Sequence, residues 1–567
     1  MSHPSSKQSA PPRTPVREWF VAGTASLTLA FTAWGLGGVQ AWSLHTLLAG
    51  GLLSLLFALA PWPSVGAARR SGNRRQRAEG RVPGMVSKEQ RRPGTQISAS
   101  VEPTVASSLA TASSDPVAST SSHPSSTPSR SEPDPVEGRP PLSSTTAVVR
   151  LLRWPFFWFS LAFLVYLLIG ALNPAAEVVR DERGWWVQAI QPTFAVWLPT
   201  SVRSDYEPMN AWRVLASFTA TFSLVWGLWA GLTRRKPVLL VLWCLLLSGA
   251  AMGLVGILQH LNEAKAVLWT FPSSNEDFWG SFFYRNQAAA YLNLILVAAA
   301  FLFFYHAVKT RQNLRSGGPH FLCFFLFAGT ATSIGLALSR GGILFGLILS
   351  FVFIALLLLY AIQSIFHVRS LILSVLTLLL LSVGSYSIII YIDLDAIEQR
   401  FGDIEATIEN ADQNARAIST QATWEMAQAR LAQGWGAGSF RYIFPMYQRN
   451  YPKIYYSRYH PQKGGSGRSM FRYAHNDIVQ FVAEYGLVGT SLIFGGIAML
   501  VLQSLYHSRG QTFAVLILLA GTSQAFGHAF LDFIFNSPAY WMAFIGLLVA
   551  AAKLLQLEAT RRVSRSG

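Results

Sequence analysis

Apolar runs of about 20 residues alternate with short polar connections along most of the 567-residue chain. A run of this length spans the hydrocarbon core of a bilayer as one helix. The runs fall near 19–36, 43–62, 152–172, 211–231, 237–257, 287–307, 320–338, 341–361, 370–391, 477–504, 511–531 and 536–556. This pattern predicts an all-α polytopic membrane protein with about twelve transmembrane helices.

Two long polar segments interrupt the pattern. Residues 65–147 are rich in Ser, Pro, Thr and Arg and nearly free of aromatic side chains, so they cannot bury enough apolar surface to fold. Residues 392–476 separate the ninth span from the tenth. The predicted organisation is two transmembrane helices in 1–64, a disordered cytoplasmic linker in 65–147, helices three to nine in 148–391, a large periplasmic loop in 392–476, and helices ten to twelve with a cytoplasmic tail in 477–567.

The Lys and Arg residues of the short connections predict the orientation. With twelve spans, the basic clusters before span one, after spans two and twelve, and after spans four, six and eight all fall on one side. The positive-inside rule makes that side cytoplasmic. We therefore expect a multi-pass membrane protein with both termini in the cytoplasm. The loop 392–476 also carries basic residues, but long loops cross a membrane largely regardless of their charge.

Composition and charge narrow the function classes. Hydrophobic residues make up 51% of the chain and charged residues 13%, with a net charge of +17. The basic residues stand mostly between apolar runs, so membrane topology explains the charge, and we expect membrane lipids rather than nucleic acid as partners. Cys244 and Cys323 both lie in apolar runs, which argues against a disulfide framework. No spacing of a metal motif is present, so we predict neither a metal nor another cofactor.

Three polar clusters at predicted outer span ends carry the candidate chemistry: one around Arg285, one at Ser339-Arg340-Gly341-Gly342, and one at His475-Asn476. A charged side chain at membrane depth costs about 3 kcal/mol on insertion scales, and Arg340 stands between two apolar runs. Arginine binds phosphate through its planar fork, and histidine is a general base near neutral pH. The clusters suit a reaction at a phosphate-bearing substrate. The alternatives are Arg anchors at helix ends and a capping His.

Tyrosines alternate with basic residues in the second half of the loop 392–476, and Tyr447 and Tyr451 are two of them. Tyrosine faces stack on sugar rings and their hydroxyls form hydrogen bonds, which indicates contact with a glycan. The same mixture of residues is also typical of an aromatic belt at the membrane interface.

Five motifs occur in the order known from one protein family. His475-Asn476 is followed after nine residues by Gly486 and then by Gly489. The other pieces are the Tyr-Arg285-Asn286 segment, the Ser-Arg340-Gly turn, the stretch from Arg416 through Gly434-Trp-Gly436 to Phe440, and a late His528, Asp532 and Pro538. From about residue 210 to 550 the chain resembles the O-antigen ligase family, which also includes O-antigen polymerases and protein O-oligosaccharyltransferases.

The resemblance implies an inverting, metal-independent glycosyltransferase that acts on the outer face of the bacterial inner membrane. Its donor is a glycan on undecaprenyl pyrophosphate. The acceptor is lipid A–core in ligases, another carrier-linked glycan in O-antigen or exopolysaccharide polymerases, and a protein Ser or Thr in oligosaccharyltransferases. By position, the catalytic residues would be His475, Arg340 and Arg285. Candidates for substrate binding are Asn476, which could orient His475, together with Arg416, Tyr447, Tyr451 and Asp532. Arg416 could instead bridge to Glu405 or Asp412.

Two other classes of function stay open. A transporter should carry ionisable residues or broken helices near the middle of the membrane, often in repeated halves, and the sequence shows no repeat. A structural membrane protein would explain the spans but not the ordered Arg, Arg and His motifs on one face.

Overall fold

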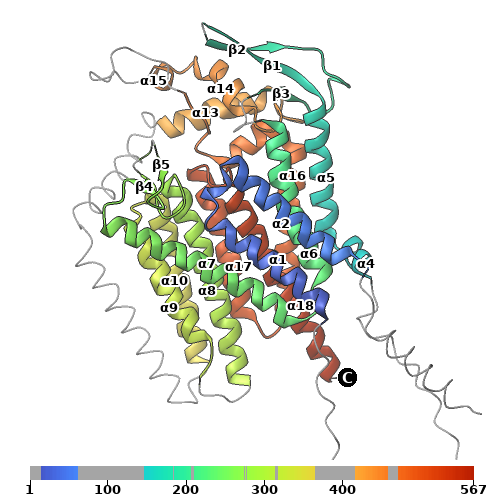
Figure 1. Cartoon of the computed structure of the whole chain (residues 1–567), viewed down its shortest axis with the longest axis vertical. Helices are drawn as coiled ribbons and strands as arrows, with labels where there is room; N and C mark the ends of the chain where they lie inside the picture. Colours follow the sequence, from blue (N-terminus) through green and yellow to red (C-terminus); the bar gives the residue numbers. More distant parts are fainter. Residues whose placement is uncertain are drawn as a thin grey trace, which may run out of the picture. The chain divides into compact units, whose positions relative to one another are not determined.

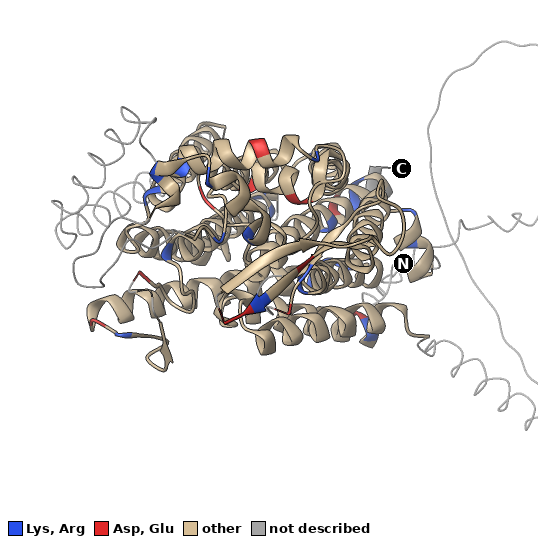
Figure 2. Cartoon of the chain, turned by 90° about the horizontal axis from the view of Figure 1, so that it is seen from above, with Lys and Arg blue, Asp and Glu red and all other residues tan. Residues whose placement is uncertain are grey.

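The computed structural model describes residues 15–61, 146–182, 184–205, 210–273, 275, 277–312, 317–363, 415–456 and 470–566. Contacts divide the chain into two compact units, and the helical fold belongs to the one formed by residues 1–60 and 145–567. Its long helices pack side by side, as Figure 1 shows, and the positions of charged residues are few and scattered along the ribbon (Figure 2).

The long helices are α1 (Val16–Thr32), α2 (Ala41–Leu59), α5 (Pro155–Leu172), α6 (Ala211–Gly231), α7 (Arg235–Leu261), α8 (Arg285–Gln312), α9 (His320–Leu336), α10 (Arg340–Ile362), α16 (Asp477–Tyr506), α17 (Thr512–Leu531) and α18 (Pro538–Ser566). The shorter ones are η1 (Leu36–Gly38), α4 (Ala147–Leu152), α13 (Ala415–Gln428), α14 (Phe440–Gln448) and α15 (Pro452–Tyr455). Within the described residues, nine helices are long and apolar enough to cross a membrane: α2, α5, α6, α7, α8, α10, α16, α17 and α18.

The predicted all-α polytopic class is therefore confirmed. Two further predicted spans correspond to α1 and α9, each of which has 17 residues. The predicted span 370–391 lies outside the described residues, as do nearly all of the predicted linker 65–147 and the first part of the loop 392–476.

The strands and the short helices α13, α14 and α15 lie at one end of the bundle, which we call the loop end (Figure 1). At this end α5, α7, α9 and α17 finish, and α6, α8, α10, α16 and α18 begin. Side chains from several of these termini meet there, as when Asn286 at the start of α8 donates to Asp532 after α17. The basic residues Arg234, Arg235, Lys309 and Arg562 lie at the opposite end, where the sequence predicts them to share one side.

Helix α8 is the centre of the bundle, and the membrane-spanning part of it is fully buried. Small residues at its contacts with the neighbouring helices let the backbones approach closely. A Cβ atom placed on Gly342 of α10 would lie 2.3 Å from Cβ of Ala289, and one on Gly249 of α7 would lie 2.3 Å from Cδ1 of Ile295. Larger residues at these glycines would force the helices apart. This packing fixes the start of α8, and with it Arg285.

A small sheet at the loop end was not predicted from the sequence. Strands β1 (Pro174–Asp181), β2 (Gly184–Ala189) and β3 (Ser201–Arg203) form a sheet of order β2-β1-β3, with β1 antiparallel to β2 and parallel to β3. Strands β4 (Ala266–Val267) and β5 (Phe271–Pro272) form a second, two-stranded pair. Alternate residues of β1 and β2, such as Val178 and Val187, pack against a separate hydrophobic core formed by α13 and α14.

Candidate active site

Asp532 is the residue on which the polar groups of the loop end converge. It follows the last residue of α17, and its side chain is only 3% exposed. Its Oδ2 accepts a hydrogen bond from Nδ2 of Asn286 at 2.5 Å and lies 3.4 Å from the hydroxyl of Tyr284. Its Oδ1 accepts the backbone N–H of Phe533 at 2.9 Å. A buried carboxylate of this kind is stable only with such partners.

His475 faces Asp532 from the other side. Its Nδ1 lies 3.4 Å from Oδ1 of Asp532, and its side chain remains 24% exposed. The imidazole also packs edge-on against the ring of Phe533, with 4.9 Å between ring centroids. The backbone of His475 has a φ of 57°, a left-handed conformation that is uncommon for a residue other than glycine and is found preferentially at functional sites.

Asn476 caps a helix in the structure. Its Oδ1 accepts the backbone N–H of Val479 at 3.2 Å and so begins α16, as an N-cap asparagine commonly does. The side chain that faces the imidazole of His475 is Asp532. The cap nevertheless fixes the start of α16 directly after His475.

Arg416 of α13 also reaches Asp532. One guanidinium nitrogen lies 3.8 Å from Oδ2 of Asp532, and another donates to the carbonyl of Leu531 at 3.3 Å. The alternative partners considered from the sequence, Glu405 and Asp412, lie outside the described residues.

The charges around Asp532 keep it ionised. Burial raises the pKa of this carboxyl, but the facing imidazole of His475 and the guanidinium of Arg416 outweigh burial and lower the pKa to about 2. Near neutral pH the site therefore holds a fixed negative charge beside His475.

The two other candidate arginines begin neighbouring helices. Arg285 opens α8 and forms an ion pair of 2.7 Å with Asp277, whose side chain is 52% exposed. Arg340 opens α10, which is capped by the hydroxyl of Ser339 accepting the N–H of Gly342 at 3.2 Å. The guanidinium of Arg340 is partly exposed and makes no hydrogen bond or ion pair with any described residue. It is thus available to an anionic ligand.

The turn at Arg340 packs tightly on α17. A Cβ atom on Gly341 would lie 2.8 Å from Nε2 of His528. His528 is 1% exposed, and its carbonyl accepts the N–H of Asp532. The close approach that glycine permits therefore connects the helix that carries Arg340 with the one that ends at Asp532.

Two aromatic residues of the site were not singled out from the sequence. Phe533 lies between Tyr284 and Tyr473, with centroid distances of 4.9 Å and 4.6 Å and nearly parallel rings. In a chain so rich in aromatic residues, neither Phe533 nor Tyr473 stands out. The only available signal was position, because Tyr473 stands two residues before His475 and Phe533 directly follows Asp532.

Tyr447 and Tyr451 pack on the hydrophobic core of α13 and α14. The ring of Tyr447 meets that of Trp435 edge-on at 6.3 Å, and the hydroxyl of Tyr451 donates to Glu425. Burial and the Glu425 carboxylate raise the pKa of Tyr451 to about 12. Neither residue makes a described contact with His475 or Asp532.

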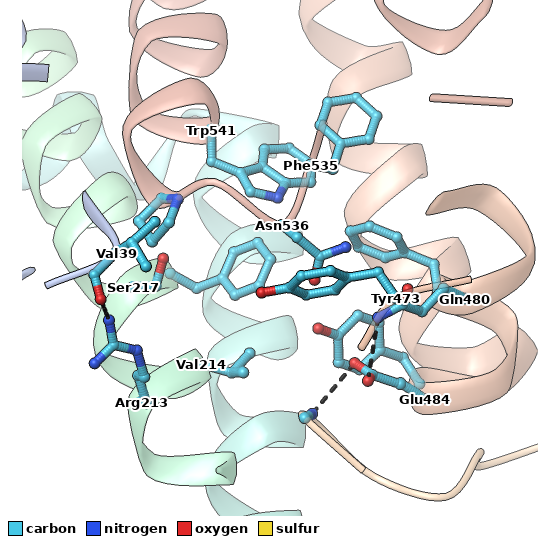
Figure 3. Close-up of a pocket in the computed structure, with 15 residues that line it drawn as sticks. Val39, Arg213, Val214, Ser217, Tyr473, Gln480, Glu484, Phe535, Asn536 and Trp541 are labelled. Carbon is cyan, nitrogen blue, oxygen red and sulfur yellow. Dashed lines mark hydrogen bonds between the residues drawn. The ribbon is translucent and has the colours of Figure 1, made fainter. Parts of the chain in front are cut away.

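A pocket of about 80 Å³ lies beside the site (Figure 3). Its wall combines aromatic rings with amide, hydroxyl and charged groups from α6, α16, α18 and the segments before them. The lining residues are Val39, Arg213, Val214, Ser217, Phe218, Gly438, Tyr473, Gln480, Phe481, Glu484, Tyr485, Phe535, Asn536, Pro538 and Trp541. Within the described parts of the chain, no group of three His, Cys, Asp or Glu side chains is arranged to hold a metal ion.

Part of the chain matches a known protein family. Residues 322–494, which run from α9 to α16 and include Arg340 and His475, match the family described as O-Antigen ligase. Over these residues the chain is similar to the O-antigen ligase family. This is a family of membrane glycosyltransferases of the ligase and polymerase type. No curated protein matches the chain. The family match confirms the predicted resemblance, and the nine apolar helices agree with a multi-pass O-antigen ligase-like protein.

Proposed function

We propose that this O-antigen ligase-like protein transfers a glycan from undecaprenyl pyrophosphate to an acceptor hydroxyl, with His475 as the general base. The observation that carries the proposal is the placement of a partly exposed imidazole against a buried, ionised Asp532, with two arginines at the starts of the adjoining helices α8 and α10. The membrane would be the bacterial inner membrane, with the loop end on the periplasmic face and both termini in the cytoplasm.

In this mechanism Asp532 orients His475. The imidazole presents Nδ1 to the carboxylate, so the tautomer with its proton on Nδ1 leaves Nε2 as the proton acceptor. Nε2 takes the proton of the acceptor hydroxyl while the oxygen forms a bond to the anomeric carbon. The fixed charge of Asp532 stabilises the imidazolium that results. A general base of this kind contributes about 10²- to 10⁴-fold to a rate.

The arginines act on the leaving group. As the bond between the anomeric carbon and the pyrophosphate oxygen breaks, negative charge develops on the lipid pyrophosphate. Arg340, which has no protein partner among the described residues, would receive that charge through its planar fork. Arg285 would bind the same group while Asp277 holds its guanidinium in place. The products are the glycosylated acceptor and undecaprenyl pyrophosphate.

The test uses purified protein in liposomes with a lipid-linked glycan and three acceptors: lipid A–core, a second carrier-linked glycan, and a Ser- and Thr-containing protein. We expect wild type to modify one of them and His475→Ala to be at least about 10²-fold slower. His507→Ala is the matched control, because His507 follows α16 at the opposite end of the bundle. Equal rates for wild type and His475→Ala would refute the assignment of the base.

The acceptor panel also separates the three variants of the proposal. Product on lipid A–core identifies a ligase, product on the carrier-linked glycan an O-antigen or exopolysaccharide polymerase, and product on protein an oligosaccharyltransferase. All three share the donor and the arrangement of His475, Arg340 and Arg285.

A further inference from the structure

The pocket beside Asp532 is built from the same two chain segments that hold the proposed site. Tyr473 lines it two residues before His475, and Asn536 lines it four residues after Asp532. Nδ2 of Asn536 donates to Asp477 at 2.8 Å, which ties the two segments together. The ring of Tyr473 stacks on Phe533, whose opposite neighbour is Tyr284. Tyr473 therefore lines the pocket and also packs against Phe533 beside the site.

The lining carries two charged residues, Arg213 and Glu484, whose groups already have partners. A guanidinium nitrogen of Arg213 donates to the carbonyl of Val39. Glu484 is 4% exposed, and its carboxylate already accepts the N–H groups of Gly438 and Phe440 at 3.2 Å and 3.1 Å. By contrast, the hydroxyls of Tyr473 and Ser217 have no hydrogen-bond partner among the described residues. In Figure 3 the ring of Tyr473 extends from the Gln480 side of the pocket toward Ser217.

These features select a class of ligand. Hydroxyl groups next to the flat faces of Trp541 and Phe535 suit a molecule that has apolar faces and a rim of hydroxyls. A volume of about 80 Å³ holds about five to eight waters at roughly 10–15 Å³ each, which is the scale of a single sugar ring.

The position of the pocket indicates which substrate it serves. None of its lining residues comes from α8 or α10, the helices that begin with Arg285 and Arg340. Asp532, at the end of α17, accepts a hydrogen bond from Asn286 of α8, and Asn536, four residues later, lines the pocket. In an inverting displacement the attacking oxygen approaches from the side opposite to the leaving group. An acceptor should therefore enter from the side of the pocket.

We propose that this pocket binds one sugar ring of the acceptor, which makes the acceptor a glycan rather than a protein hydroxyl. The inference rests on the proposed glycosyl transfer and adds the acceptor subsite to it. Tyr473 and Ser217 donate to or accept from the ring hydroxyls, Asn536 supplies its carbonyl oxygen, and Trp541 contacts the apolar face of the ring.

The first experiment measures binding in the full-length protein by saturation-transfer NMR, with D-glucose, D-galactose and N-acetyl-D-glucosamine as separate probes. We expect at least one sugar to give a signal in wild type. Ser217→Phe fills the pocket and should abolish that signal. Thr219→Phe adds the same ring to α6 at a position outside the pocket lining and should retain it. No sugar signal in wild type, or an equal loss in both variants, would overturn the inference.

The second experiment measures transfer kinetics. Tyr473→Phe keeps the ring stack and removes one hydroxyl, so the KM for the acceptor should rise about tenfold while the KM for the donor changes less than about twofold. A rise in the donor KM instead would overturn the acceptor assignment and leave the proposed transfer intact. Sugar binding at the pocket without any transfer product would refute the proposed function and with it the role of the pocket as an acceptor subsite.

Discussion

Two buried carboxylates at opposite ends of the bundle differ in how closely their cationic neighbours approach them. Glu558 of α18, 3% exposed, contacts Arg235 at 2.6 Å, Lys309 at 2.5 Å and the hydroxyl of Tyr305 at 2.8 Å. Asp532 is equally buried, but its cationic neighbours stand farther away, with His475 at 3.4 Å and Arg416 at 3.8 Å. Its shortest contact is with a neutral amide, that of Asn286.

The difference separates a structural ion cluster from a reactive one. Short charge-assisted hydrogen bonds are strong and hold both partners in place, so Glu558 connects α18 with α7 and α8 at one end of the bundle. Around Asp532 the side chains of His475 and Arg416 lie too far from the carboxylate for short charge-assisted hydrogen bonds. The imidazole of His475 keeps access to solvent. A buried carboxyl with a strongly shifted pKa beside an accessible imidazole is typical of functional sites.

The largest expected effect is that of Arg340→Ala, which removes the guanidinium that has no protein partner among the described residues. If this group stabilises the departing pyrophosphate, kcat should fall about 10²- to 10³-fold, as for the loss of one donor to a developing oxyanion. Arg340→Lys should recover only part of the rate, because an ammonium cannot form the bidentate fork. An unchanged kcat in Arg340→Ala, measured in liposomes, would leave Arg340 as a helix anchor.

Asp532→Asn should follow with a loss of about 10²-fold or more, because the amide neither orients the tautomer of His475 nor stabilises its charged form. The pKa of Asp532 is lowered to about 2, so the stabilisation from this carboxylate is complete above its unfolded pKa of about 4 and is lost only as pH falls through about 2. Asp532 is therefore ionised throughout pH 5 to 8, and Asp532→Asn should be slower than wild type at every pH in this range. Equal rates for the two proteins anywhere in this range would contradict the role of the fixed charge.

Gly341→Ala tests how the reactive end is assembled. The added Cβ would meet Nε2 of His528 at 2.8 Å, so α10 and α17 must shift and the rate should drop about tenfold, in line with the sensitivity of catalysis to small displacements. Gly329→Ala on α9 is the control, because its Cβ would meet nothing within 4 Å. Equal rates for the two variants would show that the contact at Gly341 does not position Arg340.

Glu558→Gln should have the smallest effect on activity and a clear effect on stability. The substitution weakens the pairs with Arg235 and Lys309, whose side chains are 32% and 22% exposed, so we expect a loss of about 1–3 kcal/mol rather than the full cost for wholly buried ions. The midpoint of thermal unfolding should fall while kcat at 25 °C stays within about twofold of wild type. A loss of activity as large as that of Asp532→Asn would remove the distinction between the two clusters.

The helices of this protein could be predicted from sequence because each is an apolar run long enough to span a membrane. The sheet could not, since β1 and β2 are eight and six residues long and follow directly on α5 without a clear alternation. Arg285, Arg340 and His475 were found because charged and ionisable groups are conspicuous beside apolar runs. The partnership of His475 with Asp532 joins residues far apart in the sequence, and it appears only when α16 and α17 are packed together.

The pocket could not be predicted from the sequence for the same reason. Ser217, Gln480 and Trp541 are ordinary residues of three apolar helices, and nothing in their sequence spacing places them together. Asn476 shows the opposite case. Its position next to His475 suggested an orienting role, but the backbone of the following helix uses its side chain as a cap.

Chemical rescue of the His475→Ala protein by imidazole tests the central claim most directly, because it asks whether the missing function is that of a base. Transfer by the variant should increase with imidazole concentration and rise with pH as imidazole loses its proton, whereas wild type and His507→Ala should not respond. A folded His475→Ala protein that imidazole does not restore, or that needs no restoring, would contradict the account of the Asp532 cluster as the reactive end of this membrane protein.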